Sequence, residues 1–503
     1  MERPIACLVV GAGPAGLAAA LTARRALRRA GRPDRVVVLD KAPQPGAHCV
    51  SGAICDPAAL DLLLGRQAAP VRARACAATV AGIELHLLTP GHALRLPRLL
   101  VPPFLRTGGL FVEVPALVAA LETVAADRGV EIYHGLAVQA PWWRDGRLAG
   151  VLVGEGNPQR RPSTRGTVER IPADCTIVAD GACGNLSEIL GRGRRRDARR
   201  VWSLGLKAVF AHDAPTGFAH LAGWPLGPLA CGGGFCYRPG DGRVHAGLIA
   251  PIGPGEPPCD PVALWRELRA HPLLREWCGT APPLSTGARL LPESGLRSAG
   301  PFAGPGWLAV GDAAGLVDAR RQRGLELALR SGVAAGRAVA QADPGAACPA
   351  LLDRLGVFAA LRRARNFRQA FALPGGPALA CVQEFLPLAP PHRRGRQRLR
   401  HPPTRNRSKD VFAARARCRY PRHALPHVAV GDTASCRDCI DRFGAPCVSV
   451  CPGGVYACGA DRQIRASHEN CLHCRACAVA CPHAAIAWSP PAEGGGPCLP
   501  PSD

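Results

Sequence analysis

The chain has 503 residues, of which 47% are hydrophobic, and its formal net charge is +24 at pH 7. This length gives room for about two to four globular domains with a large buried core. Aromatic residues make up only 5% of the chain, and the sequence contains no nucleic-acid-binding module. We therefore exclude nucleic acid as a partner and expect this basic chain to meet anionic membranes or acidic proteins. The lysines are Lys41, Lys207 and Lys409, so nearly all of the basic charge is arginine, a bias that genomic composition alone can produce.

The 23 cysteines point to a reducing compartment, because many of them cluster at spacings typical of metal ligands rather than of disulfides. The chain runs directly into an apolar strand at residues 5–10, with no signal or transit peptide before it. It has no run of the ~20 apolar residues that are needed to cross a bilayer. We expect a location on the cytoplasmic face of the inner membrane, with peripheral or monotopic attachment.

The N-terminal segment predicts a dinucleotide-binding unit. A buried strand at 5–10 leads into Gly11-Ala12-Gly13-Pro14-Ala15-Gly16, and an Ala/Leu/Arg-rich helix follows at 17–30. The first glycine permits a tight turn, the second lets a pyrophosphate approach, and the third lets the helix pack on the strand. A second strand at 35–39 ends at an acidic residue that suits ribose hydroxyls. The predicted cofactor-binding residues here are Val10, Gly11, Ala12, Gly13, Pro14, Ala15, Gly16, Asp40 and Lys41.

Two further segments favour FAD over NAD as the nucleotide. A short buried strand at 307–310 runs into Gly311 and Asp312, and a helix follows at 324–340. This pattern resembles flavoproteins of the glutathione-reductase type, in which such an aspartate meets the ribityl chain. A helix N-cap is the alternative role for Asp312. The strand and turn at 175–181 resemble the segment that such folds place beside the first glycine loop, so the FAD-binding domain is expected to be discontinuous.

The strongest chemical signal is a pair of cysteine runs near the C-terminus, each ending in Cys-Pro. Three thiolates at close spacing can occupy three corners of one iron–sulfur cube, and the Cys-Pro of each run then serves the other cluster. A zinc ribbon would instead stop at paired C-x2-C knuckles. The pattern predicts a two-cluster, [4Fe–4S] ferredoxin-like module. The runs are Cys436, Cys439, Cys447 and Cys451, then Cys471, Cys474, Cys477 and Cys481.

Together these patterns predict an α/β protein with four regions. The first is a discontinuous, Rossmann-like FAD-binding domain of the glutathione-reductase type at 1–75, 111–199 and 290–345. A mixed α+β domain facing quinone or substrate comprises 76–110 and 200–289. A helical, membrane-surface and basic linker region spans 346–424, and a [4Fe–4S] ferredoxin-type domain spans 425–503.

The segment Gly46-Ala47-His48-Cys49-Val50-Ser51-Gly52-Ala53 resembles electron-transfer flavoprotein–ubiquinone oxidoreductases, as do the segments at 223–226, 232–235, 451–456 and 493–497. The resemblance implies that FAD and a [4Fe–4S] cluster pass electrons from a soluble electron-transfer flavoprotein to a membrane quinone. It adds Gly46, Ser51 and Gly52 to the expected FAD site. The family's single cluster matches Cys451, Cys471, Cys474 and Cys477. The extra cysteines Cys436, Cys439, Cys447 and Cys481 resemble the related Fix membrane flavoproteins fused to their ferredoxin, which implies a second cluster.

The expected membrane contact rests on apolar segments at 371–382 and 385–388, followed by an arginine-rich strip at 393–407. A buried hairpin before a solvated linker is the alternative. The apolar segment at 99–105 is a candidate lining for a quinone channel, or part of the core. His48 is either a turn residue or a proton donor beside the flavin, and we predict no catalytic residue.

Three rival functions remain at this stage. One is a component of a Fix-type electron-bifurcating complex, which the second set of cysteines favours. Another is a FAD-dependent lipid reductase of the geranylgeranyl-reductase kind. The third is a non-catalytic redox scaffold that binds clusters without quinone reductase activity. The sequence names no donor for the two protons that quinone reduction consumes.

Overall fold

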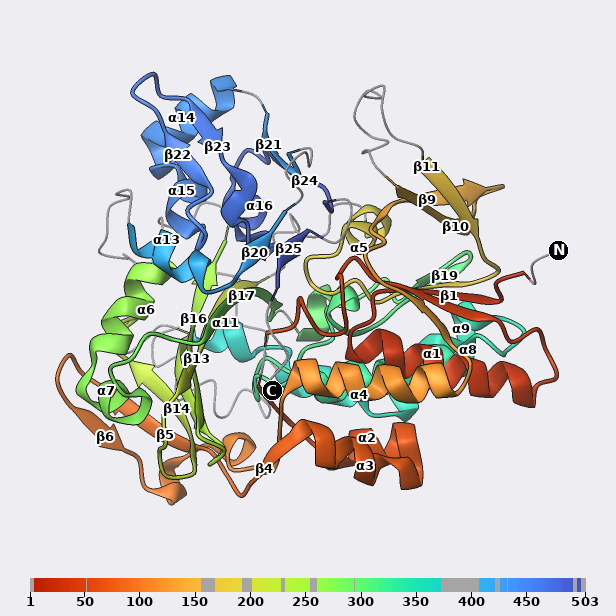
Figure 1. Cartoon of the computed structure of the whole chain (residues 1–503), viewed down its shortest axis with the longest axis horizontal. Helices are drawn as coiled ribbons and strands as arrows, with labels where there is room; N and C mark the ends of the chain where they lie inside the picture. Colours follow the sequence, from red (N-terminus) through yellow and green to blue (C-terminus); the bar gives the residue numbers. More distant parts are fainter. Residues whose placement is uncertain are drawn as a thin grey trace.

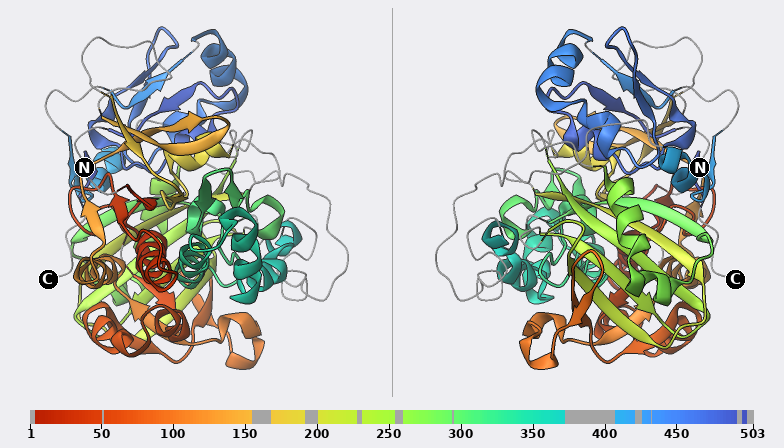
Figure 2. Two further views of the ribbon diagram at one scale, coloured as in Figure 1. Left: turned by 90° about the vertical axis from the view of Figure 1, so that its right-hand side faces the viewer. Right: turned by 90° about the vertical axis from the view of Figure 1, so that its left-hand side faces the viewer.

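A computed structural model describes residues 4–50, 52–154, 168–191, 201–227, 231–253, 260–293, 295–371, 407–420, 426–431, 433–491 and 495–498. Figure 1 shows the N-terminal and central segments in two adjoining parts, with the C-terminal unit seated over both. The views in Figure 2 show the same arrangement from two sides.

The first part is built on a six-stranded sheet in the order β18-β19-β12-β1-β2-β8. All of its neighbouring strands pair in parallel except β18, which is an antiparallel edge. The central strands are fully apolar and buried, as expected when helices or sheets cover both faces of a parallel sheet. The strands are β1 (Cys7–Val10), β2 (Val36–Leu39), β8 (Glu131–Tyr133), β12 (Thr176–Val178), β18 (Ala303–Gly304) and β19 (Trp307–Ala309).

Helices and a small sheet pack on this parallel sheet. The antiparallel sheet of β9, β10 and β11 shares a hydrophobic core with β1, β12 and the long helices. The elements are α1 (Pro14–Arg29), α4 (Val114–Asp127), α5 (Asn185–Leu190), α8 (Leu325–Ala338), β9 (Val138–Arg144), β10 (Arg147–Gly154) and β11 (Val168–Pro172).

Glycines let α1 and α8 approach closely. A Cβ at Gly332 would overlap the Ala15 carbonyl oxygen and lie 2.8 Å from the Ala18 Cβ. One turn later, a Cβ at Gly336 would lie 2.6 Å from the Ala19 carbonyl oxygen. The backbones of these two helices therefore touch along one face, which holds the N-terminus of α1 in place.

The second part is a seven-stranded sheet in the order β17-β13-β16-β15-β14-β5-β6. It is antiparallel except for the β14–β5 pair. Its members are β5 (Glu84–Leu88), β6 (Ala93–Arg95), β13 (Trp202–Ala211), β14 (Gly217–Gly223), β15 (Gly233–Arg238), β16 (Arg243–Ile252) and β17 (Ser285–Pro292), with helices α6 (Pro261–Ala270) and α7 (Pro272–Cys278) beside it.

Shorter elements complete these two parts. β7 pairs with both β3 and β4 in a three-stranded antiparallel sheet. The elements are β3 (Ala53–Cys55), β4 (Cys76–Val80), β7 (Gly109–Val112), α2 (Pro57–Leu64), α3 (Ala68–Ala75), α9 (Pro344–Arg354), α10 (Val357–Ala364) and α11 (Phe367–Phe371). Within the described residues no single helix is long and apolar enough to cross a membrane. The helices α9 and α10 taken together have the length and apolar composition of a membrane span, but the pair is bent by 66°.

The C-terminal unit consists of short strand pairs and helices around the cysteine runs. Val450, Leu472, Ala476 and Val479 share a hydrophobic core with the seven-stranded sheet, so the unit does not stand apart. Its elements are α13 (Arg407–Ala414), β20 (Cys418–Arg419), β21 (Val428–Val430), α14 (Thr433–Phe443), α15 (Pro446–Val450), β22 (Tyr456–Cys458), β23 (Ile464–Ala466), α16 (Ala476–Ala480), β24 (Ile486–Trp488) and β25 (Gly496–Pro497).

The structure confirms the predicted fold class, and it moves several element ends. The first helix begins at Pro14 rather than residue 17, because proline at the first helical position has its φ already set for a helix. The helix expected at 324–340 spans Leu325–Ala338. The apolar segments at 371–382 and 385–388, predicted to meet the membrane, and the arginine-rich strip at 393–407 lie almost wholly outside the described residues. The domain boundaries stay predictions.

We predict that Gly332→Val separates α1 from α8 and destabilises the protein by about 1–3 kcal/mol, the usual cost of overpacking a core. The melting temperature should fall by several degrees, and bound flavin should be lost first, because the α1 N-terminus moves. Thermal unfolding followed by flavin fluorescence measures both effects.

Gly91→Val is the control, because a Cβ at Gly91 would meet no atom within 4 Å. Equal melting temperatures and flavin contents for the two variants would contradict the role given to the α1–α8 contact.

Candidate flavin and iron–sulfur sites

The glycine loop lies where β1 ends and α1 begins, at the carboxyl edge of the parallel sheet. Gly11 has a φ of +108°, and a Cβ there would clash with the backbone of Ala179 at the end of β12. A Cβ at Gly16 would overlap the Gly11 carbonyl oxygen, whereas one at Gly13 would meet open space. Among the described residues no side chain caps the N-terminus of α1. Its free N–H groups and the open side of the loop suit a pyrophosphate.

Asp40 joins the end of β2 to this loop. Its Oδ2 accepts a hydrogen bond from the Ala12 N–H at 2.6 Å, and its Oδ1 accepts one from the Ala42 N–H at 2.6 Å. Beside it, burial and Arg289 lower the pKa of Lys41 to about 8. The predicted residues Val10, Pro14 and Ala15 complete the strand-to-helix turn.

Gly46 and Gly52 both have positive φ values, of 71° and 78°. A Cβ at Gly46 would lie 2.8 Å from the Cα of Pro115, while one at Gly52 would overlap the Lys207 Nζ. Ser51 lies outside the described residues. His48 lies in a turn, where burial together with Lys41 and Arg289 holds its pKa well below the ordinary value.

Gly311 and Asp312 start the 3-10 turn Gly311–Ala314 directly after β19, at the same edge of the sheet. The Gly311 N–H donates to the Ser331 Oγ at 3.0 Å. Asp312 is not the cap of α8, whose N-cap is Gly324. Burial raises the pKa of Asp312, and the Arg289 guanidinium opposes this rise. The predicted nucleotide residues that follow β1, β2 and β19 therefore gather at one edge of the sheet, and the open loop, the uncapped helix and the buried carboxylate fit FAD.

The cysteines of the first predicted cluster, Cys451, Cys471, Cys474 and Cys477, are all buried. Burial raises the pKa of Cys474, and the nearby Cys451 and Cys477 raise it further. The Cys451 Sγ accepts from the Val455 N–H at 3.4 Å, and the Tyr456 hydroxyl donates to the Cys477 Sγ at 3.1 Å. A group of buried thiols that disfavour one another's ionisation is costly without positive charge, so a cationic iron–sulfur core suits this set.

The remaining cysteines of the two runs line a single small cavity in the C-terminal unit. Its walls include Cys436, Cys439, Cys447 and Cys481, together with apolar side chains such as Ile440 and Ile486. Every residue that lines it belongs to the segment 430–486. Cys481 of the second run thus lies at one cavity with three cysteines of the first run.

The loop 471–477 lies between these cysteines and the flavin segments. The Arg475 guanidinium donates to the carbonyl oxygens of Cys183 and Gly184 at 3.0 and 3.1 Å. The Cys183 thiol donates to the Cys474 carbonyl oxygen at 3.0 Å. Lys41 Nζ lies 3.5 Å from the His473 Nδ1. The cysteine loop is therefore in direct contact with the predicted flavin domain.

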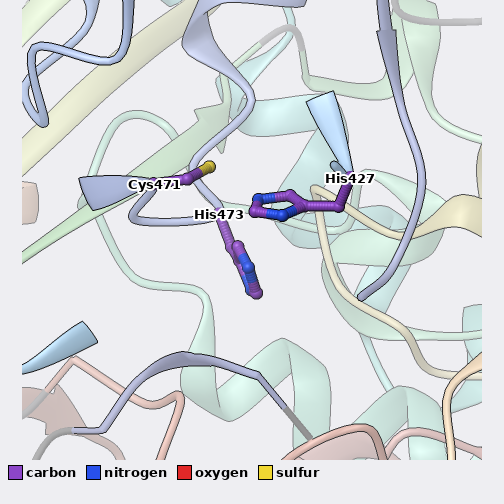
Figure 3. A group of neighbouring side chains, drawn as sticks. All are labelled: His427, Cys471 and His473. Carbon is purple, nitrogen blue, oxygen red and sulfur yellow. The ribbon is translucent and has the colours of Figure 1, made fainter. Parts of the chain in front are cut away.

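Two histidines beside Cys471 form a group that geometry alone would allow to hold a metal. One ligand atom from each of His427, Cys471 and His473 lies within 4.8 Å of the others (Figure 3). The Tyr420 hydroxyl meets the His473 Nε2 at 3.0 Å and donates to the Cys471 carbonyl oxygen at 2.5 Å. Cys471 also belongs to the predicted set of cluster ligands, and the rings of His427 and His473 pack against each other with centroids 5.2 Å apart.

Sequence reasoning missed Arg475, Cys183, His427 and Trp488. The Arg475 guanidinium stacks over the Trp488 ring at 4.5 Å. The sequence offers one signal for these contacts, the basic residue Arg475 inside the C-x2-C-x2-C run. Its partners come from distant segments of the chain, so no local pattern reveals them.

Comparison with known proteins gives three family matches. They are electron transfer flavoprotein–ubiquinone oxidoreductase, 4Fe–4S, at residues 408–500, ETF-QO, ubiquinone-binding, at 202–291, and an NAD(P)-binding Rossmann-like domain at 9–64. The ubiquinone-binding match covers β13 to β17, the core of the seven-stranded sheet.

Solved structures support the fold. A geranylgeranyl bacteriochlorophyll reductase-like protein of Thermoplasma acidophilum is similar with a TM-score of 0.54 at 18% identity, over 75% of this chain and 89% of that one. The flavin-dependent halogenase CmlS is similar with a TM-score of 0.51 at 17% identity, over 84% of this chain and 74% of that one. At these identities the likeness shows the FAD-dependent oxidoreductase fold alone.

Curated relatives match along nearly the whole chain. The mitochondrial electron transfer flavoprotein–ubiquinone oxidoreductase of Oryza sativa subsp. japonica is 28% identical over 97% of this chain and 92% of its own length. The enzyme of that name from Pseudomonas aeruginosa is 26% identical over 98% of both chains. Two family-specific domain matches and these relatives thus show that the chain is similar, along nearly its whole length, to electron transfer flavoprotein–ubiquinone oxidoreductases.

Proposed function

We propose that this protein is an electron-transfer-flavoprotein:quinone oxidoreductase. It accepts electrons from a reduced electron-transfer flavoprotein and passes them through [4Fe–4S] and FAD to a quinone. The observation that carries the proposal is the contact between the loop 471–477 and the segments around Lys41 and Cys183. It brings a cluster ligand set and a flavin site into one buried junction.

The proposed FAD site comprises the loop at 10–16, Asp40, Lys41, Gly46, Ser51, Gly52, Gly311 and Asp312. When bound, FAD supplies a centre that exchanges electrons singly or in pairs. The chain's own part is to hold the nucleotide on the α1 N-terminus, to exclude water from the junction, and to fix the spacing of the centres through Arg475 and Cys183.

We further propose that Cys436, Cys439, Cys447 and Cys481 hold a second cluster. The cavity that they line supports this, because it brings all four sulfur-bearing residues to one place. Since only residues 430–486 line it, the second cluster would stand farther from the flavin than the first, with helix α14 at the outer end of the unit (Figure 1). The electron donor would then dock at the α14 end.

The second cluster also keeps one alternative open, namely a component of a Fix-type complex in which a separate branch reduces ferredoxin. Copurified electron-transfer flavoprotein subunits with NADH-dependent ferredoxin reduction would favour it.

Membrane attachment is supported by an apolar surface loop after β6. Leu99 and Leu100 are 82% and 65% exposed, which is unusual for large apolar side chains that stand next to one another. The same loop contacts α11, with the rings of Phe104 and Phe367 5.7 Å apart. In the sequence, α11 runs into the apolar segments at 371–382 and 385–388 that are predicted to meet the membrane. These features suit monotopic insertion of the loop into one leaflet of an anionic membrane.

Anaerobic purification should yield about eight irons with one FAD per chain. Cys439→Ala should remove about four of these irons and leave flavin in place. Cys474→Ala should abolish quinone reduction while flavin is retained, because the junction cluster is lost.

Cys458→Ala is the matched control, since this cysteine is exposed and lies outside both sets. An iron content of about four in the wild-type protein would contradict the proposed second cluster. Unchanged turnover in Cys474→Ala would show that the first cluster does not lie on the electron path.

Leu99→Asp with Leu100→Asp should abolish sedimentation with vesicles of phosphatidylcholine and phosphatidylglycerol, because charged side chains cannot enter the leaflet. Reduction of a water-soluble quinone should persist.

Val411→Asp is the control, since Val411 is 67% exposed but lies on α13 of the C-terminal unit. Undiminished sedimentation of the double variant would contradict attachment through this loop.

A further inference from the structure

A buried charged group lies where the first and second parts meet, next to the segment that contains Gly46 and Gly52, called the flavin loop from here on. Its members are Lys207 on β13, His245 on β16 and Glu113 after β7, which are 6%, 1% and 6% exposed. Residues of this kind are seldom buried without a reason, because burial of charge is costly unless the charge is used or paired.

The group points at the flavin loop. The Lys207 Nζ donates to the Gly52 carbonyl oxygen at 3.0 Å. A Cβ at Gly52 would lie 3.1 Å from the His245 Nδ1, so this nitrogen also faces the loop. Among the described residues neither ring nitrogen of His245 makes a regular hydrogen bond. A buried, unsatisfied nitrogen beside the predicted flavin segment indicates a place for a further polar partner.

Glycines and an aromatic ring surround the lysine. On both neighbouring strands the residue paired with Lys207 is a glycine, Gly247 on one side and Gly287 on the other. The Phe235 ring lies beneath the ammonium group, 5.9 Å from it. This ring fills the space beside Gly247, since a Cβ there would overlap the Phe235 ring.

Two members of the group, His245 and Glu113, are in contact with each other, and the strand that carries His245 reaches the surface. The His245 Nε2 and the Glu113 Oε1 are in ion-pair contact at 2.8 Å, although not in the orientation of a regular hydrogen bond. His245 and Arg243 point to the same face of β16, and Arg243 is only half-buried, next to the exposed Asp241. The line from Asp241 to Lys207 thus runs from the surface to the loop.

We propose that Glu113, His245 and Lys207 form a proton-transfer path that supplies the two protons consumed when the quinone is reduced. This inference rests on the proposed function. Quinone plus two electrons plus two protons gives hydroquinone, with one proton on each oxygen. Electrons that arrive through iron–sulfur clusters bring no protons, so both protons must come from solvent to the buried flavin and quinone site.

The charges around the path set its protonation. Burial lowers the pKa of Lys207 to about 7, with Glu113 opposing the shift. Burial and Lys207 lower the pKa of His245, against Glu113 and Asp241. Contacts with His245, Lys207 and Arg243 outweigh burial and lower the pKa of Glu113. A lysine of this kind is protonated in part at neutral pH and can both give and regain a proton.

The test uses reduced methyl viologen, a one-electron donor that carries no protons, with a short-chain ubiquinone analogue as acceptor. In Glu113→Gln and Lys207→Gln holoenzyme, viologen-driven quinone reduction should slow by about 100-fold or more, the usual contribution of a positioned proton donor. Viologen reduction of the clusters, followed by bleaching of their visible absorption, needs no proton and should keep the wild-type rate.

The pH profile separates a proton path from a merely structural role. Wild-type quinone reduction should fall as pH rises above about 7, because Lys207 loses its proton, and it should show a solvent deuterium isotope effect. Lys207→Gln should lose this limb of the profile. Should Lys207→Gln release its flavin because it disturbs Gly52, Glu113→Gln alone decides the outcome, since its side chain contacts His245 rather than the loop.

The matched controls are Glu84→Gln and His86→Gln. These residues form another His–Glu pair in the same sheet, with the His86 Nε2 and the Glu84 Oε2 3.0 Å apart, but on β5 and with Trp277 against the ring. They should leave the quinone rate and its pH profile unchanged.

The proposed path would be overturned if Glu113→Gln protein with its full flavin content kept the wild-type rate of quinone reduction, the wild-type pH profile and the wild-type isotope effect. Failure of the wild-type protein to reduce any quinone would instead overturn the proposed function, and the two results are distinguishable.

Discussion

The buried contact between the loop 471–477 and the segment after β12 is the constraint on which the redox arrangement depends. The Arg475 guanidinium donates to two carbonyl groups across this junction, and the Cys183 thiol donates back to the Cys474 carbonyl oxygen. Hydrogen bonds from a charged donor are the stronger kind, and leaving buried carbonyls unpaired would add a penalty. His473 and Arg475 adopt positive φ values of 55° and 58°, so the loop accepts backbone strain to present these side chains.

Two further contacts fix the C-terminal unit in place. The Lys409 Nζ donates to the Val448 and Ser449 carbonyl oxygens at 2.8 and 2.6 Å and lies 3.5 Å from the carboxylate of Asp260, the N-cap residue of α6. Apolar residues of α15 and α16 enter the core of the seven-stranded sheet. The cluster ligands are thus held against the parts that carry the predicted flavin and quinone sites, rather than on a tethered carrier.

Features whose physics is local could be predicted from the sequence. The glycine loop was identified because a strand, a tight turn and a helix follow one another within 30 residues, and the cysteine runs because ligand spacing is itself local. The last cysteine of each run was assigned to the other cluster from spacing alone, and the cavity containing Cys481 with Cys436 agrees with that. Asp312 was placed near the correct strand end, but its alternative role as a helix cap is wrong, since α8 begins only at Leu325.

Features that depend on tertiary contact could not be predicted. Lys207, His245 and Glu113 come from three strands or strand ends far apart in the chain, and no motif joins them. Arg475 looked like one arginine among many in a strongly basic chain. The Gly46 and Gly52 segment was recognised through family resemblance, whereas the reason for Gly52, the lysine that fills the space of its missing Cβ, required the fold.

The burial of the lysines has a practical consequence. Lys207 and Lys409 are buried and Lys41 is half-buried, and these are all the lysines of the chain. Amine-directed reagents would therefore find almost no side chain to modify on the folded surface, so cross-linking to a donor protein must use carboxylates or arginines instead. Conversely, labelling of the Lys207 amine would report that the sheet beneath the flavin loop has opened.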